Sequence, residues 1–501
     1  MPPLTNVVTV EDFYRLAPIF VAAASGILVM VIDPFVPERA KYMVGRLAVL
    51  GGLAALFSVV LSARHHGYSY PDDGAYALIN VDYFSVFLFL AIFTFTVLAL
   101  LGSLDYLERE RLQHGEYYAL VLFAAVGMAV MACAQELVTV FVGLEVSSIS
   151  SYILAGYRRN SPKSNESALK YFLLGSFATA FFLYGAALIY GGAGTTQLAQ
   201  LHDLVQHMNA DTGLVVVDRN LMVLGSALVL VGLFFKAAAA PFQFWTPDVY
   251  EGAPTPISGL FASGPKAAAF AILVRVFYGA FGSASGVWFW AVWGSAILSM
   301  FMGNLAALVQ TNIKRMLAYS SIAHAGYLLV AFAANSQIGV AALLFYVLVY
   351  ALVKIGAFTL ISHLGGVGER HVEIQDLAGL GRTQPMAALC MTIYLLSLMG
   401  LPITAGFMGK LYIFQAALSA KLTGLAVILA VNSVISAYYY LRVVRIMYFS
   451  EPAPDREAAP VPYAVGAVML FTLVATIYLG LFPDSVRSLA RASAEALRLN
   501  P

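Results

Sequence analysis

The chain has 501 residues, of which 60% are hydrophobic and 11% are charged, and its formal net charge at pH 7 is +1. A soluble protein of this length could not cover its surface with so few charges, so the composition indicates a polytopic membrane protein. The nearly balanced charge gives no indication of a nucleic acid or another strongly charged partner.

Apolar stretches long enough to cross a bilayer as helices recur along the whole chain. We therefore expect an all-α polytopic membrane protein with about 14 transmembrane helices. No segment between the stretches is long enough for a soluble domain, so the chemistry is expected within the membrane. The helices are predicted near 16–35, 42–62, 82–104, 117–134, 137–156, 167–190, 221–244, 256–281, 286–309, 313–334, 337–363, 385–420, 422–446 and 461–483.

Two of these helices are predicted to be broken. The stretch 385–420 is longer than one ordinary crossing, and Pro402 removes a backbone hydrogen bond where glycines such as Gly406 weaken the helix. We interpret this stretch as one broken helix, the twelfth, and not as two crossings. In the seventh helix, Lys236 is followed by Pro241, which predicts a second break. Broken helices in membranes line cavities or water paths.

The seventh and twelfth helices each combine a break with a lysine, and they lie five helices apart. An odd spacing reverses the direction across the membrane, as expected for two inverted five-helix repeats. The lysine precedes its proline in one helix and follows it in the other, so the repeat signal is weak. The predicted organisation is three N-terminal transmembrane helices over 1–116, a first repeat over 117–281, a second repeat over 282–447, and a C-terminal loop with the last transmembrane helix over 448–501.

Basic residues in the loops predict the orientation. Loops that follow odd-numbered helices, such as LERERLQ, YRRNSPK and QTNIKR, carry most of the lysines and arginines outside the spans. The positive-inside rule places these loops in the cytoplasm and both termini outside.

Some basic residues fall inside the predicted spans, where each isolated charge costs about 2.5–3.5 kcal/mol or more. Lys170 and Arg275 lie near helix ends, where snorkelling lowers this cost, and a structural role suits Arg275. The deeper lysines favour a functional role over a purely structural buried ion pair. They are Lys236, Lys266, Lys354 and Lys410.

Glu145, in the stretch FVGLEVSS, is expected near the midplane of the fifth helix. Lys236 is expected at a similar depth and is a reasonable partner for it. A Glu–Lys pair that opens and closes acts as a proton valve, whereas a static pair would only fix helix packing. His324 is also mid-span; its imidazole titrates near neutrality and can relay protons, although a hydrogen-bonded packing role is equally open.

Four stretches resemble a known family: FQFWTPDVYEGAPTPIS (242–258), ESALKYFLLGSFATAFFLYGAALIYG (166–191), QTNIKRMLAYSSIAHAGYLL (310–329) and GLPITAGFMGKLYIF (400–414). They are similar to the antiporter-like membrane subunits of respiratory complex I (NADH-quinone oxidoreductase, NDH-1), which are related to Mrp antiporters. The resemblance covers nearly the whole chain. Lys410 in GFMGKLY resembles the N-type subunit, whereas the M-type subunit would carry glutamate there. The length and the absence of the long lateral helix of the L-type subunit also fit subunit N.

The resemblance implies a multi-pass subunit of the bacterial cell inner membrane that moves protons, coupled to quinone reduction in other subunits. It implies that Glu145 pairs with Lys236, and that Lys410 is the terminal proton-exchanging residue. Lys354 departs from the family pattern, and it either adds a link to the proton path or is tolerated beside that path. The implied proton path consists of Glu145, Lys236, Lys266, His324, Lys354 and Lys410.

We expect no redox centre or metal in this chain, because its two cysteines, Cys133 and Cys390, lie in apolar stretches without metal-ligand spacing. The resemblance places quinone, FMN and iron–sulfur clusters in partner subunits. It implies other membrane subunits as partners, especially small K-type and M-type antiporter-like neighbours, within the lipid bilayer.

Three alternatives stay open. The chain could belong to a Mrp-type Na⁺/H⁺ antiporter or a membrane-bound hydrogenase, which would share the fold and the charged axis. A lipid-linked sugar flippase would also use buried lysines, but Glu145 and the stretch NIKRMLAYSSIAHAGY argue against it. The chain could also be a passive scaffold subunit.

Overall fold

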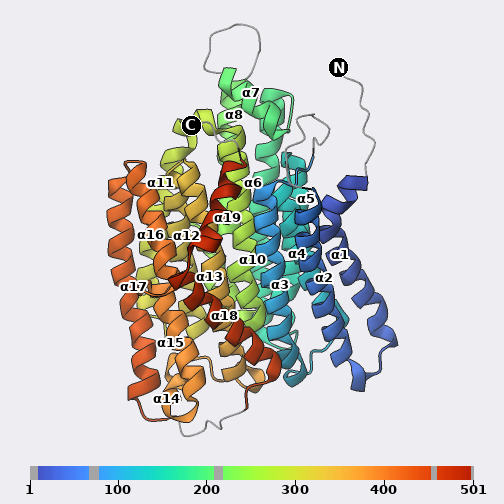
Figure 1. The fold of residues 1–501 in the computed structure, drawn as a ribbon, viewed down its shortest axis with the longest axis vertical. Helices are drawn as coiled ribbons and strands as arrows, with labels where there is room; N and C mark the ends of the chain where they lie inside the picture. The colour runs from blue at the N-terminus through green and yellow to red at the C-terminus, as the bar shows by residue number, and fades with distance from the viewer. Residues whose placement is uncertain (1–9, 67–77, 208–217, 453–459, 498–501) are drawn as a thin grey trace.

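The computed structural model describes residues 10–66, 78–207, 218–452 and 460–497. In these ranges the regular structure is helical, apart from isolated β-bridges. Thirteen of the described helices are long and apolar enough to cross a membrane, and they stand side by side in one bundle (Figure 1). The expected all-α membrane protein is confirmed.

Most predicted ranges agree with the observed helices to within a few residues at each end. The long helices are α1 (Val10–Ile32), α2 (Tyr42–His66), α3 (Tyr83–Arg109), α4 (Gly115–Cys133), α5 (Leu137–Ala155), α6 (Pro162–Ala193), α8 (Arg219–Ala237), α10 (Thr255–Leu273), α11 (Ser285–Leu308), α12 (Ile313–Ala333), α13 (Gln337–Leu364), α17 (Thr423–Phe449) and α18 (Tyr463–Leu481). The shorter helices are α7 (Leu198–His207), α9 (Trp245–Gly252), α14 (Leu380–Thr383), α15 (Pro385–Met399), α16 (Ala405–Ser419) and α19 (Asp484–Glu495). A π-helical segment, η3 (Val274–Ala280), continues α10, and the short turn η5 (Val367–Glu369) follows α13.

The twelfth crossing is one broken helix, as predicted. Helices α15 and α16 have 15 residues each, and each rises about 22 Å, which is shorter than the apolar core of a bilayer. In Figure 1, α15 occupies the lower part of the bundle and α16 the upper part. The chain turns at Gly400 (φ 92°) and Ile403 (φ 79°), on either side of Pro402.

Gly406, which is predicted to weaken the helix near Pro402, lies just after the turn and not within it. It lies in the first turn of α16, where its backbone N–H donates to Ser397 Oγ at 3.1 Å. A Cβ at this position would overlap the carbonyl oxygen of Ser397. Gly406 therefore permits the close approach of α16 to the last turn of α15.

The seventh crossing is also broken, but earlier than the position of its proline suggested. Helix α8 ends before Ala238, which has a left-handed backbone (φ 58°). Pro241 lies beyond it, in the unwound segment between α8 and α9. The indole N–H of Trp245 donates to the carbonyl of Phe235 at 3.1 Å, and Ser299 of α11 accepts from the unwound backbone. These contacts satisfy backbone groups that the break frees inside the membrane.

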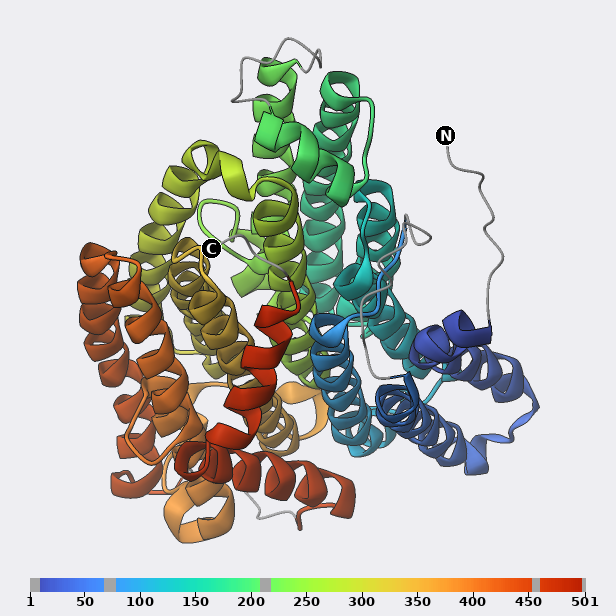
Figure 2. The ribbon, with the colours of Figure 1, turned by 45° about the horizontal axis from the view of Figure 1, so that its top comes forward.

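Helix α19 was not predicted, because its charged sequence does not read as a membrane span. It packs against α13 and α3, and the hydroxyl of Ser493 donates to the carbonyl of Tyr83 at 3.2 Å. The start of α1 and the end of α19 lie toward the same end of the bundle (Figure 1). Figure 2 shows α1 and α2 at one edge of the molecule and α17 at the opposite edge. Helix α10 is buried along its whole length between them.

Candidate functional site

Four of the predicted site residues are lysines in the interior of the bundle. Their relative exposures are 5% for Lys236, 2% for Lys266, 0% for Lys354 and 6% for Lys410. They come from four different helices, α8, α10, α13 and α16. Among the described residues, none of the four forms an ion pair with a carboxylate; each donates to a hydroxyl or carbonyl oxygen instead. Static buried ion pairs therefore do not explain these lysines.

Lys236 and Glu145 lie in the same region without direct contact. Lys236 Nζ donates to Ser148 Oγ at 2.8 Å. Glu145 lies one turn before Ser148 on α5 and acts on Lys236 only through its charge. Its Oε1 is buried and accepts no hydrogen bond from the described residues. A small cavity of about 10 Å³ adjoins Lys236 and Ser148. The structure therefore holds the predicted pair in an open arrangement.

Lys266 is bound to α12. Its Nζ donates to the carbonyl of Ser321 at 2.5 Å and to the Ser321 hydroxyl at 2.8 Å. The hydroxyl of Tyr350 donates to Ser321 Oγ at 2.7 Å. Lys266 Nζ also lies 5.3 Å from the centre of the Tyr350 ring, within cation–π distance.

Lys354 lies beside Lys266. Its Nζ donates to the carbonyl of Leu317 at 2.8 Å and to Ser320 Oγ at 2.9 Å. It also lies 5.7 Å from the centre of the Tyr350 ring. The two lysines thus share one aromatic ring and bond to adjacent serines of α12.

His324 is connected to Lys354 through the hydroxyls of Ser320 and Tyr440, which form a line of polar contacts. The hydroxyls of Ser320 and Tyr440 lie 2.6 Å apart, and Tyr440 lies 3.2 Å from His324 Nε2. On the other side of the ring, Nδ1 lies 2.6 Å from the hydroxyl of Tyr346. Hydroxyl and imidazole groups both donate and accept, so this chain of contacts can pass a proton in either direction.

Lys410 lies at the far end of this line, at the break of the twelfth helix. Its Nζ donates to the carbonyl of Met399 at 2.9 Å and lies 4.8 Å from the centre of the Tyr327 ring. In the described residues no hydrogen bond joins Lys410 to His324, or Lys236 to Lys266. The charges of Lys410, Lys354 and Lys266 nevertheless all act on His324.

Sequence reasoning missed the hydroxyl groups that link the lysines. Serines of α5 and α12 accept from three of them. Tyr440 of α17 joins Ser320 to His324, whereas Tyr346 and Tyr350 of α13 bind His324 and Ser321, respectively. One signal was available, since the pair of serines in AYSSIAH lies one turn before the histidine on the same helix. The missed residues are Ser148, Ser320, Ser321, Tyr346, Tyr350 and Tyr440.

Arg275 and Lys170 lie outside this line. Arg275 is 4% exposed and forms a bidentate pair with Asp82, at 2.7 and 3.1 Å. Its structural role is therefore that of a buried ion pair and not of a snorkelling side chain. Lys170 is partly exposed and pairs with Asp248 and Glu166, each at 2.6 Å.

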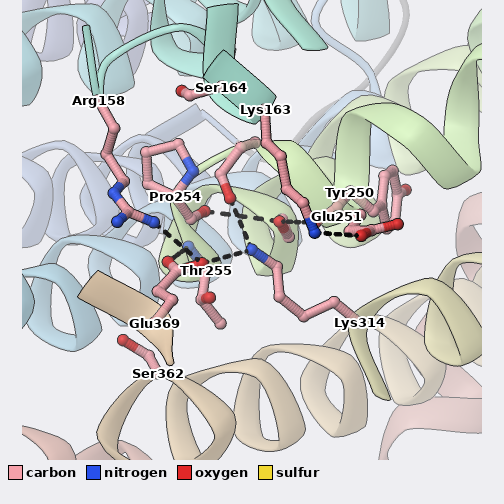
Figure 3. Close-up of polar contacts among 12 residues, drawn as sticks. Arg158, Lys163, Ser164, Tyr250, Glu251, Pro254, Thr255, Lys314, Ser362 and Glu369 are labelled. Atoms are coloured by element: carbon pink, nitrogen blue, oxygen red, sulfur yellow. Dashed lines mark hydrogen bonds and ion pairs between the residues drawn. The ribbon is translucent and has the colours of Figure 1, made fainter. Parts of the chain in front are cut away.

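A second charged cluster, around Glu369 in η5, was not predicted, because its lysine was assigned to a loop. Lys314, in the first turn of α12, donates to Glu369 Oε2 at 2.8 Å (Figure 3). Glu369 Oε1 accepts from the hydroxyl of Tyr106 and from the backbone N–H of Thr255, both at 2.8 Å. Burial raises the pKa of Glu369, but the charge and hydrogen bond of Lys314, the charge of Arg158 and the hydrogen bond from Thr255 together hold the pKa below its usual value.

The neighbouring Arg315 contacts two carboxylates of α9. It donates to Asp248 at 2.7 Å and to Glu251 at 3.0 Å. Burial raises the pKa of both carboxyls, but Lys170 and Arg315 lower that of Asp248, and Lys163 and Arg315 lower that of Glu251, to below their usual values. Arg315 therefore ties the start of α12 to α9 through two carboxylates.

The comparisons with known proteins agree with this geometry. The family model described as NADH:quinone oxidoreductase/Mrp antiporter, TM matches residues 134–436. NADH-quinone oxidoreductase subunit N 1 of Solibacter usitatus is 45% identical over 99% of this chain and 100% of that protein. The chain belongs to the subunit N family of NADH-quinone oxidoreductase. Subunit N 2 of Koribacter versatilis, another member, is 46% identical over 97% of each chain.

Solved structures of relatives place this subunit N family member among respiratory complexes. A chain of respiratory complex I from Thermus thermophilus with bound aureothin is 37% identical, covers 95% of this chain and 99% of that one, and has a TM-score of 0.76. A chain of the archaeal membrane-bound sulfane sulfur reductase is 25% identical with a TM-score of 0.83, and the two chains cover 96% and 97% of each other. A chain of the Mrp complex from Dietzia sp. DQ12-45-1b, at 23% identity, 98% coverage of each chain and a TM-score of 0.82, shows the shared fold. The family resemblance read from the sequence is confirmed.

In the described ranges, no group of three or more His, Cys, Asp or Glu residues is placed to hold a metal ion. The buried charged groups of the described interior include the four lysines spread along α8, α10, α13 and α16, together with the Arg275–Asp82 and Lys314–Glu369 pairs.

Proposed function

We propose that this subunit translocates protons across the membrane as part of NADH-quinone oxidoreductase, coupled to quinone reduction in other subunits. The observation that carries the proposal is the set of four buried lysines that form no ion pair with a carboxylate of the described residues and are held by neutral oxygens. The proposed path consists of Glu145, Lys236, Lys266, Lys354, His324 and Lys410.

The physical basis is the cost of a buried ammonium without a counter-ion. Each lysine keeps its proton only while the surrounding charges favour it, so a change at one site moves protons at the next. Lys266 and Lys354 illustrate this coupling, because both contact the ring of Tyr350 and repel one another when both are charged. The hydroxyls between them supply the donors and acceptors for transfer.

The electron-transfer chemistry belongs to partner subunits in this proposal. Quinone, FMN and iron–sulfur clusters would be bound there, and this chain would contribute the proton path alone. Glu145 lies on α5 beside the exposed side chains of Val142 and Ile149. We propose this face as the contact with a neighbouring membrane subunit, with small K-type and M-type antiporter-like subunits as the candidates.

We further propose that 117–281 and 282–447 form two inverted repeats, preceded by three transmembrane helices over 1–116 and followed by 448–501. Matching glycine contacts support this division. Gly127 of α4 leaves no room for a Cβ against the backbone of Ser147, and Gly303 of α11 leaves none against that of Ala323. The separation along the chain is 20 residues in both cases, since 147 − 127 = 323 − 303 = 20.

The proposed orientation follows the basic loops. The end of the bundle with the Glu369 cluster would face the cytoplasm of a bacterial cell, and both termini would lie on the periplasmic side of the inner membrane. Arg158 and Arg159, in the loop after α5, and Lys314 and Arg315, at the start of α12, place four cations at this end.

A Mrp-type antiporter or a membrane-bound hydrogenase subunit is the second candidate, since the fold is shared. The identities favour complex I, at 37% for the Thermus chain against 23% for the Mrp chain. A lipid-linked sugar flippase would need a large cationic cavity, whereas the cavity beside Lys236 measures about 10 Å³.

The test replaces Lys236 with Ala and, separately, Glu145 with Gln in the assembled complex. Quinone reduction and proton pumping are measured together in membrane vesicles, and both are expected to fall at least about tenfold because a proton-transfer group is lost. Lys163→Met is the control, because Lys163 is 72% exposed and lies outside the path. Normal rates in both variants would favour a passive scaffold.

A further inference from the structure

The structure contains a buried Glu–Lys pair, but it is not the pair that the sequence suggested. Lys314 and Glu369 lie 2.8 Å apart, with side-chain exposures of 1% and 6%. They join α12 to the segment after α13, at the end of the bundle that we assign to the cytoplasm. Neither residue belongs to the line of lysines described above.

We propose that Glu369 and Lys314 form the inner proton gate of the subunit, through which protons from the cytoplasmic water reach Lys354. This inference rests on the proposed function, because a gate has a role only if protons move along the lysines.

The outer side of the gate leads to water. A hollow of about 460 Å³ at this end of the bundle is lined by Glu110, Arg158 and neighbouring polar residues. Arg158 lies between the hollow and the gate, with its guanidinium nitrogens 3.8 Å from Glu110 and 3.5 Å from Glu369. Glu110 in turn accepts from the backbone N–H of Gly368, next to Glu369, at 2.8 Å. One polar contact therefore separates Glu369 from the hollow.

The inner side of the gate leads to the lysines. The carbonyl of Leu317, which accepts from Lys354, lies one turn along α12 from Lys314. Lys314 also donates to the carbonyl of Ala253 at 2.7 Å, at the end of α9. On α9, the side chain of Tyr250 interacts with Ser321, which binds Lys266. Lys354 thus binds α12 one turn beyond Lys314, and Lys266 binds it at the following turn.

The transfer balances in three steps. A proton from the hollow binds the Glu369 carboxylate and breaks its charge attraction to Lys314. Lys354 first passes its own proton along the proposed path and becomes a neutral amine. The Lys314 ammonium then gives a proton to this amine. Finally the Glu369 carboxyl returns its proton to the Lys314 amine, and the ion pair forms again. One proton has entered, and both gate residues are restored.

A purely structural lock is the alternative role for this pair. Stabilisation alone explains the Lys314–Glu369 pair poorly, because buried ion pairs add little stability over apolar residues of similar volume. Helix α9 is already fixed by Arg315, which binds Asp248 and Glu251. The location of the pair between the hollow and Lys354 is what a gate requires.

The decisive variant is Lys314→Arg in the assembled complex. Arginine keeps the positive charge and can keep the pair with Glu369, but it does not release its proton near neutral pH. A gate predicts normal assembly with quinone reduction and pumping lowered at least about tenfold. Lys163→Met, at the exposed surface of the same end, is the matched control and is expected to be normal.

The double variant Lys314→Met with Glu369→Gln covers the case in which arginine does not fit. It removes both charges together, so no unpaired charge is buried and the complex can assemble. Normal pumping in either assembled variant would overturn the gate. Lys236→Ala, measured beside them, separates the two proposals. If it loses pumping while the Lys314 variants keep it, the gate fails alone; if every variant pumps normally, the proposed function fails as well.

Discussion

Lys236 Nζ donates a hydrogen bond to Ser148 Oγ at 2.8 Å. The hydroxyl holds the ammonium one turn away from Glu145, whose Oε1 accepts no hydrogen bond from the described residues. The charge of Glu145 nevertheless acts on Lys236. Ser148 thus holds the Lys236 ammonium where the charge of Glu145 still acts on it, without a direct hydrogen bond between the two groups.

Removing this hydroxyl should disturb pumping. In Ser148→Ala, Lys236 loses its acceptor, which costs about 1–3 kcal/mol for a charged group, and we expect it to turn toward Glu145. Pumping measured in vesicles should fall about threefold or more while the complex assembles normally. Ser150→Ala, which removes a hydroxyl that bonds only within α5, is the control. Equal rates in the two variants would mean that Ser148 does not hold Lys236 in a working position.

Tyr350 connects Lys266 and Lys354 through its ring and its hydroxyl. Tyr350→Phe keeps the ring contacts but removes the hydroxyl that donates to Ser321. We expect a moderate loss of pumping, about three- to tenfold, since one hydrogen bond of about 1–1.5 kcal/mol disappears. Tyr184→Phe, at an exposed tyrosine of α6, should pump normally. An unchanged rate in Tyr350→Phe would remove this hydroxyl from the path.

Lys354 can be tested as a member of the path. Lys354→Met removes the ammonium that binds Leu317 and Ser320 and retains a side chain of similar length. If protons pass through Lys354, pumping should fall at least about tenfold, as for Lys266→Met. A normal rate together with a defective Lys266→Met would show that Lys354 is tolerated beside the path.

Gly406 should be among the least tolerant positions of the twelfth helix. In Gly406→Ala the new Cβ would overlap the Ser397 carbonyl, and overpacking of this kind costs about 1–3 kcal/mol or more. We expect less assembled complex in membranes and a lower melting temperature after solubilisation. Gly424→Ala, where a Cβ meets nothing within 4 Å, should be neutral. Similar amounts of complex in both variants would contradict the close approach of α15 and α16.

Acid should weaken the Glu369 cluster. The folded-state pKa of Glu369 lies below its usual value, so the pair stabilises the fold above the unfolded pKa of about 4.3, and this contribution is lost as the pH falls through the folded pKa. The melting temperature of the solubilised complex should therefore drop on acidification below that range. In Glu369→Gln the drop should be shallower, because the titrating group is absent. Parallel curves would show that the carboxyl does not carry this effect.

The helices of this protein could be predicted because hydropathy and span length determine them almost alone. The stretch 385–420 was correctly interpreted as a single broken crossing, since proline and glycine interrupt its middle. Hydropathy does not predict α19, because charged residues alternate with its apolar side and lower the mean hydropathy of the helix.

The site could be predicted only in part. Buried lysines stand out in an apolar sequence, and the structure places all four in the interior. Their partners do not stand out, because a serine such as Ser321 carries no charge and is common in membrane helices. The pairing of Lys314 with Glu369 joins residues 55 positions apart, and no local pattern connects them.

The two broken helices share a feature that the order of their residues conceals. Lys236 precedes its break, in the last turn of α8, whereas Lys410 follows its break and reaches back to the carbonyl of Met399, the last residue of α15. Lys236 thus belongs to the last turn of a half-helix and the Lys410 ammonium binds the last carbonyl of another, where the aligned peptide dipoles carry about half a negative charge. This backbone charge favours the charged form of a lysine, and unlike a carboxylate it cannot be neutralised by a proton.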